Sequence, residues 1–145
     1  MTKGEIAKEY FLSGKNCSVS VVLAFKEELG LPDDTLKKLA IGFGGGIGRQ
    51  RMVCGAVLGM VTVLSGVLSD GENKLAIYEI VQQACEKFRQ ETGSLICGEL
   101  LSGKIKVETS PVPEERTEQY YKKRPCADMC QLAADITQEL IEKYK

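Results

Sequence analysis

The sequence contains no histidine, and none of its six cysteines form a pair with the Cys-x-x-Cys spacing. The absence of histidine excludes hydrolytic chemistry that depends on an imidazole base. The absence of Cys-x-x-Cys excludes the thioredoxin-type redox motif and the usual cysteine knuckles of zinc ribbons. Any site built from the cysteines must therefore bring together distant parts of the chain.

The sequence also lacks a strong charge excess and a long apolar run. Its formal net charge is −1, so we expect no broad basic face for nucleic acid. The longest apolar stretch, about Met52 to Leu68, is interrupted by glycines and is too short to span a membrane. The N-terminal stretch MTKGEIAKEYFLSG is charged and amphipathic, unlike a signal peptide. We therefore expect a cytoplasmic protein in which residues 1–145 form a single domain.

Helical signals recur along the chain and predict an all-α bundle of about five to six helices. Capping-box patterns stand at Thr2–Glu5 and Ser69–Glu72, and Asn16 can cap a second helix. The only alternation with period two is a brief one at 104–108. The expected helices cover 2–13, 17–29, part of 31–43 with Asp33 or Asp34 as its cap, 54–68, 69–91, a short segment from 97, and 126–144.

The segment 54–68 is apolar on nearly all sides, which predicts a buried helix at the centre of the bundle. Gly55 and Gly59 lie four residues apart in it, and Gly66 follows seven residues later. These glycines form a smooth stripe against which another helix can pack closely.

The glycine-rich loop GFGGGIGRQR, at 42–51, invites a comparison with phosphate-binding loops. No window of it completes the Gly-x-Gly-x-x-Gly fingerprint, and no Lys-Ser/Thr pair follows its final glycine. The loop also follows a predicted helix rather than a strand. We therefore interpret it as a close-packed turn that delivers Cys54 to the start of a helix.

Four cysteines stand at predicted helix starts, where free amides and the helix dipole lower a thiol's pKa and favour the thiolate. These are Cys17, Cys54, Cys97 and Cys126. The simpler alternative is four unrelated buried thiols. Cys85 lies on the apolar face of a helix and is predicted to be a core residue. Cys130, one turn after Cys126, is a thiol that supports the site, a resolving partner or a core residue.

Two arginines lie just before Cys54. We expect Arg49 and Arg51 either to stabilise its thiolate, to hold an anionic partner, or to be solvated loop residues. The polar stretch 103–124, with two prolines, is predicted to be a long loop with at most one helical turn near 115–121. A loop of this length is either functional or a solvated linker.

The order and spacing of these segments resemble a family of redox-active proteins named for its cysteine pattern, C-GCAxxG-C-C. The name's glycine before the second cysteine is not matched, because residue 53 is valine. The resemblance implies a redox role but no particular reaction. It implies that the family cysteines are Cys17, Cys54, Cys97 and Cys126 and that Cys85 and Cys130 are additional. The matching stretches, between about residues 5 and 142, are NCS at 16–18, GFGGGIGR at 42–49, CGAVLG at 54–59, LICGELL at 95–101 and Cys126.

Three functions stay open from the sequence. The first is thiol–disulfide exchange or electron transfer, with a pair such as Cys54 and Cys97 cycling and Cys17 or Cys126 resolving. The second is a binding module in which the same four thiolates, Cys17, Cys54, Cys97 and Cys126, ligate an iron–sulfur cluster or zinc. The third is a structural or interaction domain with inert thiols. The first two require these thiols to converge. The sequence does not show whether the protein is an enzyme, which redox partner it uses or whether it forms a homodimer.

Overall fold

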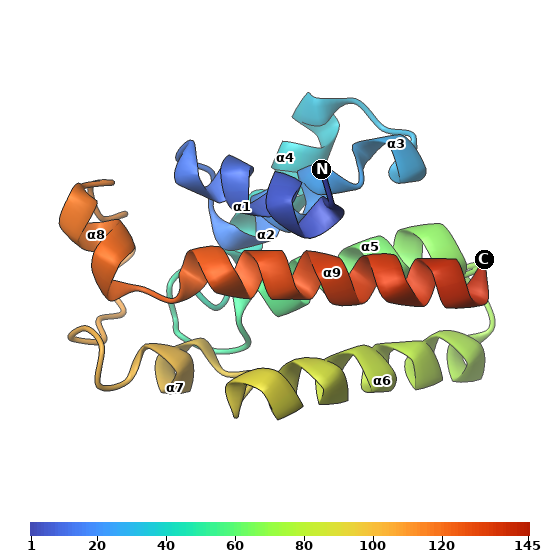
Figure 1. Cartoon of the computed structure of the whole chain (residues 1–145). Helices are drawn as coiled ribbons and strands as arrows, with labels where there is room; N and C mark the ends of the chain where they lie inside the picture. Colours follow the sequence, from blue (N-terminus) through green and yellow to red (C-terminus); the bar gives the residue numbers. More distant parts are fainter.

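The computed structural model describes residues 1–145 and consists of helices and connecting loops, which confirms the all-α prediction (Figure 1). Its only β-type pairing is one isolated antiparallel bridge, between Val53 and Ile96. The period-two stretch at 104–108 forms no strand. The helices are α1 (Lys3–Leu12), α2 (Cys17–Ala24), α3 (Lys26–Leu29), α4 (Asp33–Ala40), a 3₁₀ turn η1 (Ile41–Phe43), α5 (Gly55–Leu68), α6 (Lys74–Thr92), α7 (Cys97–Leu101), α8 (Glu118–Lys123) and α9 (Cys126–Tyr144).

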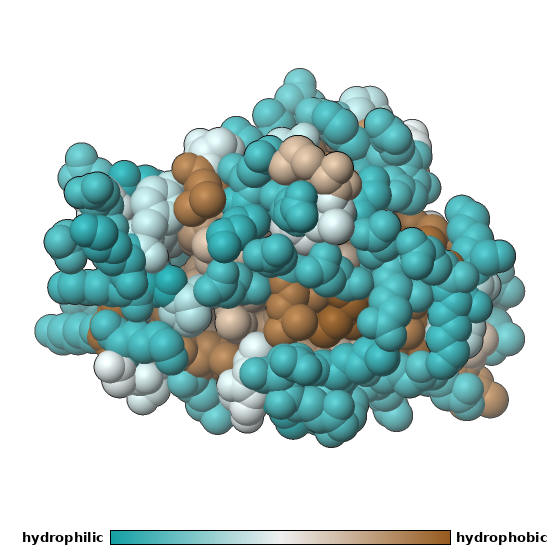
Figure 2. Space-filling view, in the orientation of Figure 1, coloured by the Kyte–Doolittle hydropathy of each residue, from teal (hydrophilic) through white to brown (hydrophobic).

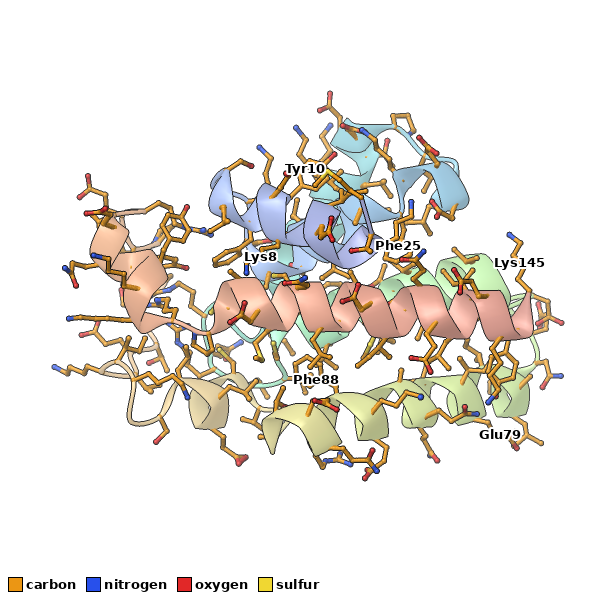
Figure 3. All side chains as sticks on the ribbon, viewed as in Figure 1. Lys8, Tyr10, Phe25, Glu79, Phe88 and Lys145 are labelled. Carbon is orange, nitrogen blue, oxygen red and sulfur yellow. The ribbon has the colours of Figure 1, made fainter.

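The arrangement places the two longest helices side by side. In Figure 1, α9 crosses the middle of the molecule, with α6 along one side and α1 and α2 along the other. The apolar helix α5 packs against α2, α6 and α9, so it occupies the predicted central position. Phe88 of α6 is fully buried and lies between α6 and α9 (Figure 3). The short helices α7 and α8 both lie toward the end of the molecule where α9 begins, on opposite sides of its start (Figure 1).

The observed caps confirm some predicted helix starts. The Thr2 hydroxyl accepts a hydrogen bond from the Glu5 amide at the start of α1, and the Asn16 side chain accepts one from the Val19 amide at the start of α2. Such side-chain caps satisfy amides that have no partner within the helix. Gly30 adopts the left-handed conformation that ends α3, as expected for a helix-terminating glycine.

Other predicted boundaries were wrong, and each for a local reason. The predicted helix 17–29 breaks at Phe25, whose ring is buried in the core, so that α2 and α3 are separate. Asp33 opens α4 instead of capping it, and no side chain caps that helix. The Asp70 carboxylate accepts hydrogen bonds from the Glu72 and Asn73 amides, which makes a turn, and Asn73 caps α6. The nine observed helices exceed the predicted five to six, in part because 17–29 breaks at Phe25 and because α8 forms where at most one helical turn is predicted.

The surface of the face in view is mostly hydrophilic, with hydrophobic residues showing in a band between α9 and α6 (Figure 2). No helix is both long enough and apolar enough to cross a membrane.

The glycines of α5 do allow close packing, as their spacing predicts. A Cβ atom on Gly59 would lie 2.9 Å from the Ser18 carbonyl oxygen and 3.0 Å from Val21 Cβ, both on α2. A Cβ on Gly55 would lie 3.3 Å from Cys17 Cβ. Since real Cβ atoms are rarely this close to their neighbours, α2 can approach α5 only because these positions carry no side chain.

Gly59→Leu should therefore destabilise the protein by overpacking, by on the order of 1–3 kcal/mol or more. The free energy of unfolding, measured by chemical denaturation, tests this. Gly42→Leu is the matched control, because Gly42 has ordinary backbone angles and open space around it. An unchanged unfolding midpoint for Gly59→Leu would contradict close contact between α2 and α5.

Candidate functional site

A cavity of about 670 Å³ lies where the predicted site cysteines meet. Cys17 opens α2, Cys54 precedes α5, Cys97 opens α7 and Cys126 opens α9, and all four line this one cavity. Cys17 and Cys126 are half-buried, whereas Cys54 and Cys97 are buried. Four segments that are distant in sequence thus contribute one cysteine each to a single hollow.

Backbone pairing holds Cys54 beside Cys97. The Cys54 amide donates to the Leu95 carbonyl at 2.7 Å, and the Cys97 amide donates to the Met52 carbonyl at 2.6 Å. These bonds flank the Val53–Ile96 bridge. The start of α7 is therefore attached to the strand-like segment that leads into α5, and this brings the two cysteines to the same wall of the cavity.

Side-chain contacts group the other cysteines. The Cys17 thiol contacts the thiols of both Cys126 and Cys130. The Cys130 thiol also lies 3.8 Å from the Cys17 carbonyl oxygen. Cys130 is fully buried and does not line the cavity, so it is a core residue in direct contact with a site residue. Its position one turn after Cys126 was the signal for this. Cys85 lies on α6, apart from the cavity.

The glycine-rich loop has an unusual backbone. Five consecutive residues, from Gly45 to Arg49, adopt left-handed angles, and so does Arg51. Three of these six are not glycine, and each such residue costs on the order of 1 kcal/mol. The Arg51 amide donates to the Gly45 carbonyl and the Met52 amide to the Gly46 carbonyl, which closes the loop on itself. The loop is the close-packed turn that its glycines predict, and it directs two arginines to the cavity.

Neither arginine acts on Cys54 as we expected. Arg51 lies against Cys97 instead, with its Nη1 3.7 Å from the Cys97 sulfur. Arg49 reaches the polar stretch 103–124, where it contacts the carbonyl oxygens of Ser110 and Val112 and pairs with Glu114.

The expectation of thiolates at the helix starts is also wrong for this structure. Burial raises the pKa of Cys54 to about 12, although the amides of Val57 and Ala56 lower it. Burial raises the pKa of Cys97 too, and Arg51 only partly opposes this. The pKa of Cys126 lies well above its ordinary value because of the contact with Cys17 and of burial. The loss of hydration of a charged sulfur outweighs the helix dipole here, so the thiols are neutral at pH 7.

The pKa of Cys17 is likewise set by opposing effects. The contact with Cys126 lowers its pKa, but the contact with Cys130 and burial raise it well above the ordinary value.

The raised pKa of Cys54 predicts a loss of stability in alkali. The unfolded protein releases this proton near the ordinary pKa of 9.0, whereas the folded protein keeps it up to about pH 12. The folded state then binds more protons over this interval, so its stability falls as pH rises from about 9 to 12. The midpoint of thermal unfolding, measured under reductant, should show this fall. Cys54→Ala should show a smaller fall, and an equal fall in both proteins would contradict the assignment.

The polar stretch 103–124 contributes to the cavity wall. Pro111, Pro113 and Glu114 line the cavity. Its helix α8 carries Tyr120, which stacks with Phe11 of α1. Residues of this stretch that the sequence reasoning missed are Arg116 and Arg124, which also line the cavity. The only signal for Arg124 was its place two residues before Cys126.

Arg116 and Arg124 fix this stretch to the body of the protein. The Arg116 guanidinium donates to the carbonyls of Phe11 and Lys15 and lies 4.7 Å from the Tyr120 ring centroid. Arg124 lies 4.4 Å from the same centroid and pairs with Glu114. These cation–π contacts and hydrogen bonds hold the stretch 103–124 against the cavity.

The side chains of cysteine, aspartate and glutamate form no group of three or more in an arrangement that could hold a metal ion. The iron–sulfur or zinc alternative at the four cysteines stays a prediction. Metal analysis and an absorption spectrum of anaerobically purified protein would test it.

Comparison with known proteins bears on this site. A sequence model of the family described as "Putative redox-active protein (C_GCAxxG_C_C)" matches residues 15–140, which include all the cavity cysteines. A curated relative from Archaeoglobus fulgidus, named only "Uncharacterized protein", is 33% identical over 98 residues. The match covers 59% of this chain and 65% of that relative, slightly less than two thirds of its length. No solved structure shows a significant match.

Proposed function

We propose, on the premise that the chain belongs to the C_GCAxxG_C_C family of redox-active proteins, that it carries out thiol–disulfide exchange through Cys17 and Cys126. The observation that carries the proposal is the contact between these two thiols at the wall of the cavity. Both line the cavity, and as whole residues they are half-buried, whereas Cys54 and Cys97 are buried.

Cys126 is the better candidate for the attacking thiol. It opens the 19-residue helix α9, and Arg124 acts against the rise of its pKa. Both the helix dipole and this cation stabilise the thiolate once the proton has left. The Cys126 thiolate attacks one sulfur of a substrate disulfide, which forms a mixed disulfide and releases the other half as a thiolate that takes up a proton.

Cys17 completes the reaction. Its thiolate attacks the Cys126 sulfur of the mixed disulfide, which forms the Cys17–Cys126 disulfide and releases the second half of the substrate as a thiol. In total, two protein thiols are oxidised and one substrate disulfide is reduced to two thiols. Cys130 contacts Cys17 from the core, where it can donate or accept a hydrogen bond with the sulfur.

Mapping of the disulfide formed on mild oxidation tests the proposal. Free thiols are blocked under denaturing conditions, and the protein is cleaved after lysine and arginine and also before Asp128, which places each of the six cysteines on a different peptide. The expected product is a peptide pair joined by Cys17 and Cys126. Cys85→Ser is the control and should give the same pair, because Cys85 lies apart from the cavity. A bond between Cys54 and Cys97, or no intramolecular bond, would contradict the proposal.

A further inference from the structure

The cavity is strongly cationic in a protein whose net charge is −1. Six cationic side chains line it, and Glu114 is the only carboxylate among the lining residues. Such an imbalance in a partly enclosed hollow produces a positive potential that attracts anions. The cationic residues are Lys15, Lys37, Arg49, Arg51, Arg116 and Arg124.

Most of the positive groups already have partners in the protein. Arg49 and Arg124 share the Glu114 carboxylate, and Arg116 donates to two carbonyl oxygens. Arg51 differs from them. Its Nε donates to the Glu108 carbonyl at 2.8 Å and its Nη1 to the Cys97 sulfur, but its Nη2 is buried and has no hydrogen-bond partner.

An unpartnered guanidinium nitrogen of this kind is costly. Arg51 is only 8% exposed. A buried donor without an acceptor loses its hydrogen bonds to water and gains none in the protein. The loop that holds Arg51 adds backbone strain, since Arg51 itself has a φ of 63°. Strained backbone and an unsatisfied buried charge occur together at binding sites, where a ligand supplies the missing partner.

We propose that the cavity binds a small disulfide that carries acidic groups, with a carboxylate or similar oxyanion held by Arg51. This substrate class rests on the disulfide exchange proposed above. The unpartnered Nη2 of Arg51 can form a charge-assisted hydrogen bond with a carboxylate oxygen, and the cavity's volume of about 670 Å³ is that of a small-molecule site. The anion also balances the excess of cations around neutral thiols. Since Pro111, Pro113, Glu114 and Tyr120 of α8 line the cavity, a small molecule fits it better than a protein surface does.

Three disulfides of equal core length and different charge test the preference. They are 3,3′-dithiodipropionate, which is dianionic, bis(2-hydroxyethyl) disulfide, which is neutral, and cystamine, which is dicationic. In a single turnover, the reduced protein should reduce the dianion with a second-order rate constant on the order of tenfold or more above that of the neutral compound, and cystamine should be slowest. An equal rate for all three, or a preference for cystamine, would overturn the proposal.

Binding without reaction separates this inference from the redox proposal. Suberate has the shape of dithiodipropionate but no sulfur, and 1,6-hexanediol and 1,6-diaminohexane correspond to the other two. Calorimetry should show binding of suberate to the reduced protein and none of the diol or diamine. If suberate binds but no disulfide is reduced, the redox proposal fails and the anion site stands. If disulfides are reduced without charge preference and suberate does not bind, the anion site fails alone.

Arg51→Gln should weaken suberate binding by on the order of tenfold or more, because a charge-assisted hydrogen bond is lost. Arg89→Gln is the matched control, since it removes the same charge from the exposed face of α6 and should bind suberate as the unchanged protein does. Unaltered binding by Arg51→Gln would overturn the role of Arg51. If that variant does not fold, as judged by circular dichroism, the three-probe comparison on the unchanged protein decides the proposal.

Discussion

Cys126→Ser should reduce the rate of disulfide reduction to that of buffer alone, because a serine hydroxyl is no substitute for the attacking thiolate. Cys17→Ser should also prevent the complete reduction of a substrate disulfide, but by a different route. It leaves Cys126 able to attack and removes the thiol that resolves the mixed disulfide. We therefore expect Cys17→Ser to accumulate a covalent adduct with half of the substrate, and Cys126→Ser to form none.

Mass spectrometry of the intact protein after incubation with dithiodipropionate measures this difference directly. Cys85→Ser is the control and should reduce the substrate as the unchanged protein does, since Cys85 lies on α6 apart from the cavity. Adduct formation by Cys126→Ser and not by Cys17→Ser would reverse the two roles. Full activity in both variants would contradict the proposal that Cys17 and Cys126 carry out the reaction.

Gly46→Ala should disrupt the glycine-rich loop and the position of Cys97 together. A Cβ atom at residue 46 would lie 2.6 Å from the Met52 backbone nitrogen and 2.8 Å from Cys97 Cβ. Gly46 also has a φ of 75°, which a residue with a side chain adopts at a cost. Since the obstacle is partly backbone, it cannot move aside as the end of a flexible side chain would.

Gly48→Ala separates the cost of the left-handed backbone from the cost of steric overlap. Gly48 also has a left-handed backbone, with a φ of 60°, but a Cβ there would have no atom within 4 Å. This variant should lose only the conformational cost, on the order of 1 kcal/mol, whereas Gly46→Ala should lose a further 1–3 kcal/mol or so from overpacking. Chemical denaturation gives both values, and alkylation of Cys97 by iodoacetamide reports whether its surroundings loosen. Equal losses in the two variants would argue against the contact between Gly46 and Cys97.

The apolar segment of α5 and the cysteine-bearing starts of α2, α7 and α9 could be predicted because local signals determine them. Asn16 caps its helix through a bond to an amide three residues away, and the apolar face of 54–68 needs only its own composition. The break at Phe25 could not be predicted in this way. Its ring is buried by residues from elsewhere in the chain, and this packing outweighs the helical tendency of 17–29.

In the candidate site, too, the features set by local sequence could be predicted and those set by packing could not. The four cavity cysteines were identified by their places at helix starts, but Arg116, Arg124 and Tyr120 were missed because nothing in a polar loop marks a residue that folds back over a distant cavity. The predicted thiolates were wrong because the helix dipole is a local property, whereas the burial that overcomes it depends on the whole fold.

The sequence by itself therefore determined the helical class, the central glycine-striped helix and the identity of the cavity cysteines, since these depend on neighbours within a few residues. Only the tertiary structure decided which thiols touch, which arginine lies beside which sulfur and which guanidinium nitrogen is left without a partner. Those relations join residues as far apart as Cys17 and Cys126 or Arg51 and Glu108. They arise when the helices pack, because packing sets the distances and removes the water that would otherwise solvate these groups.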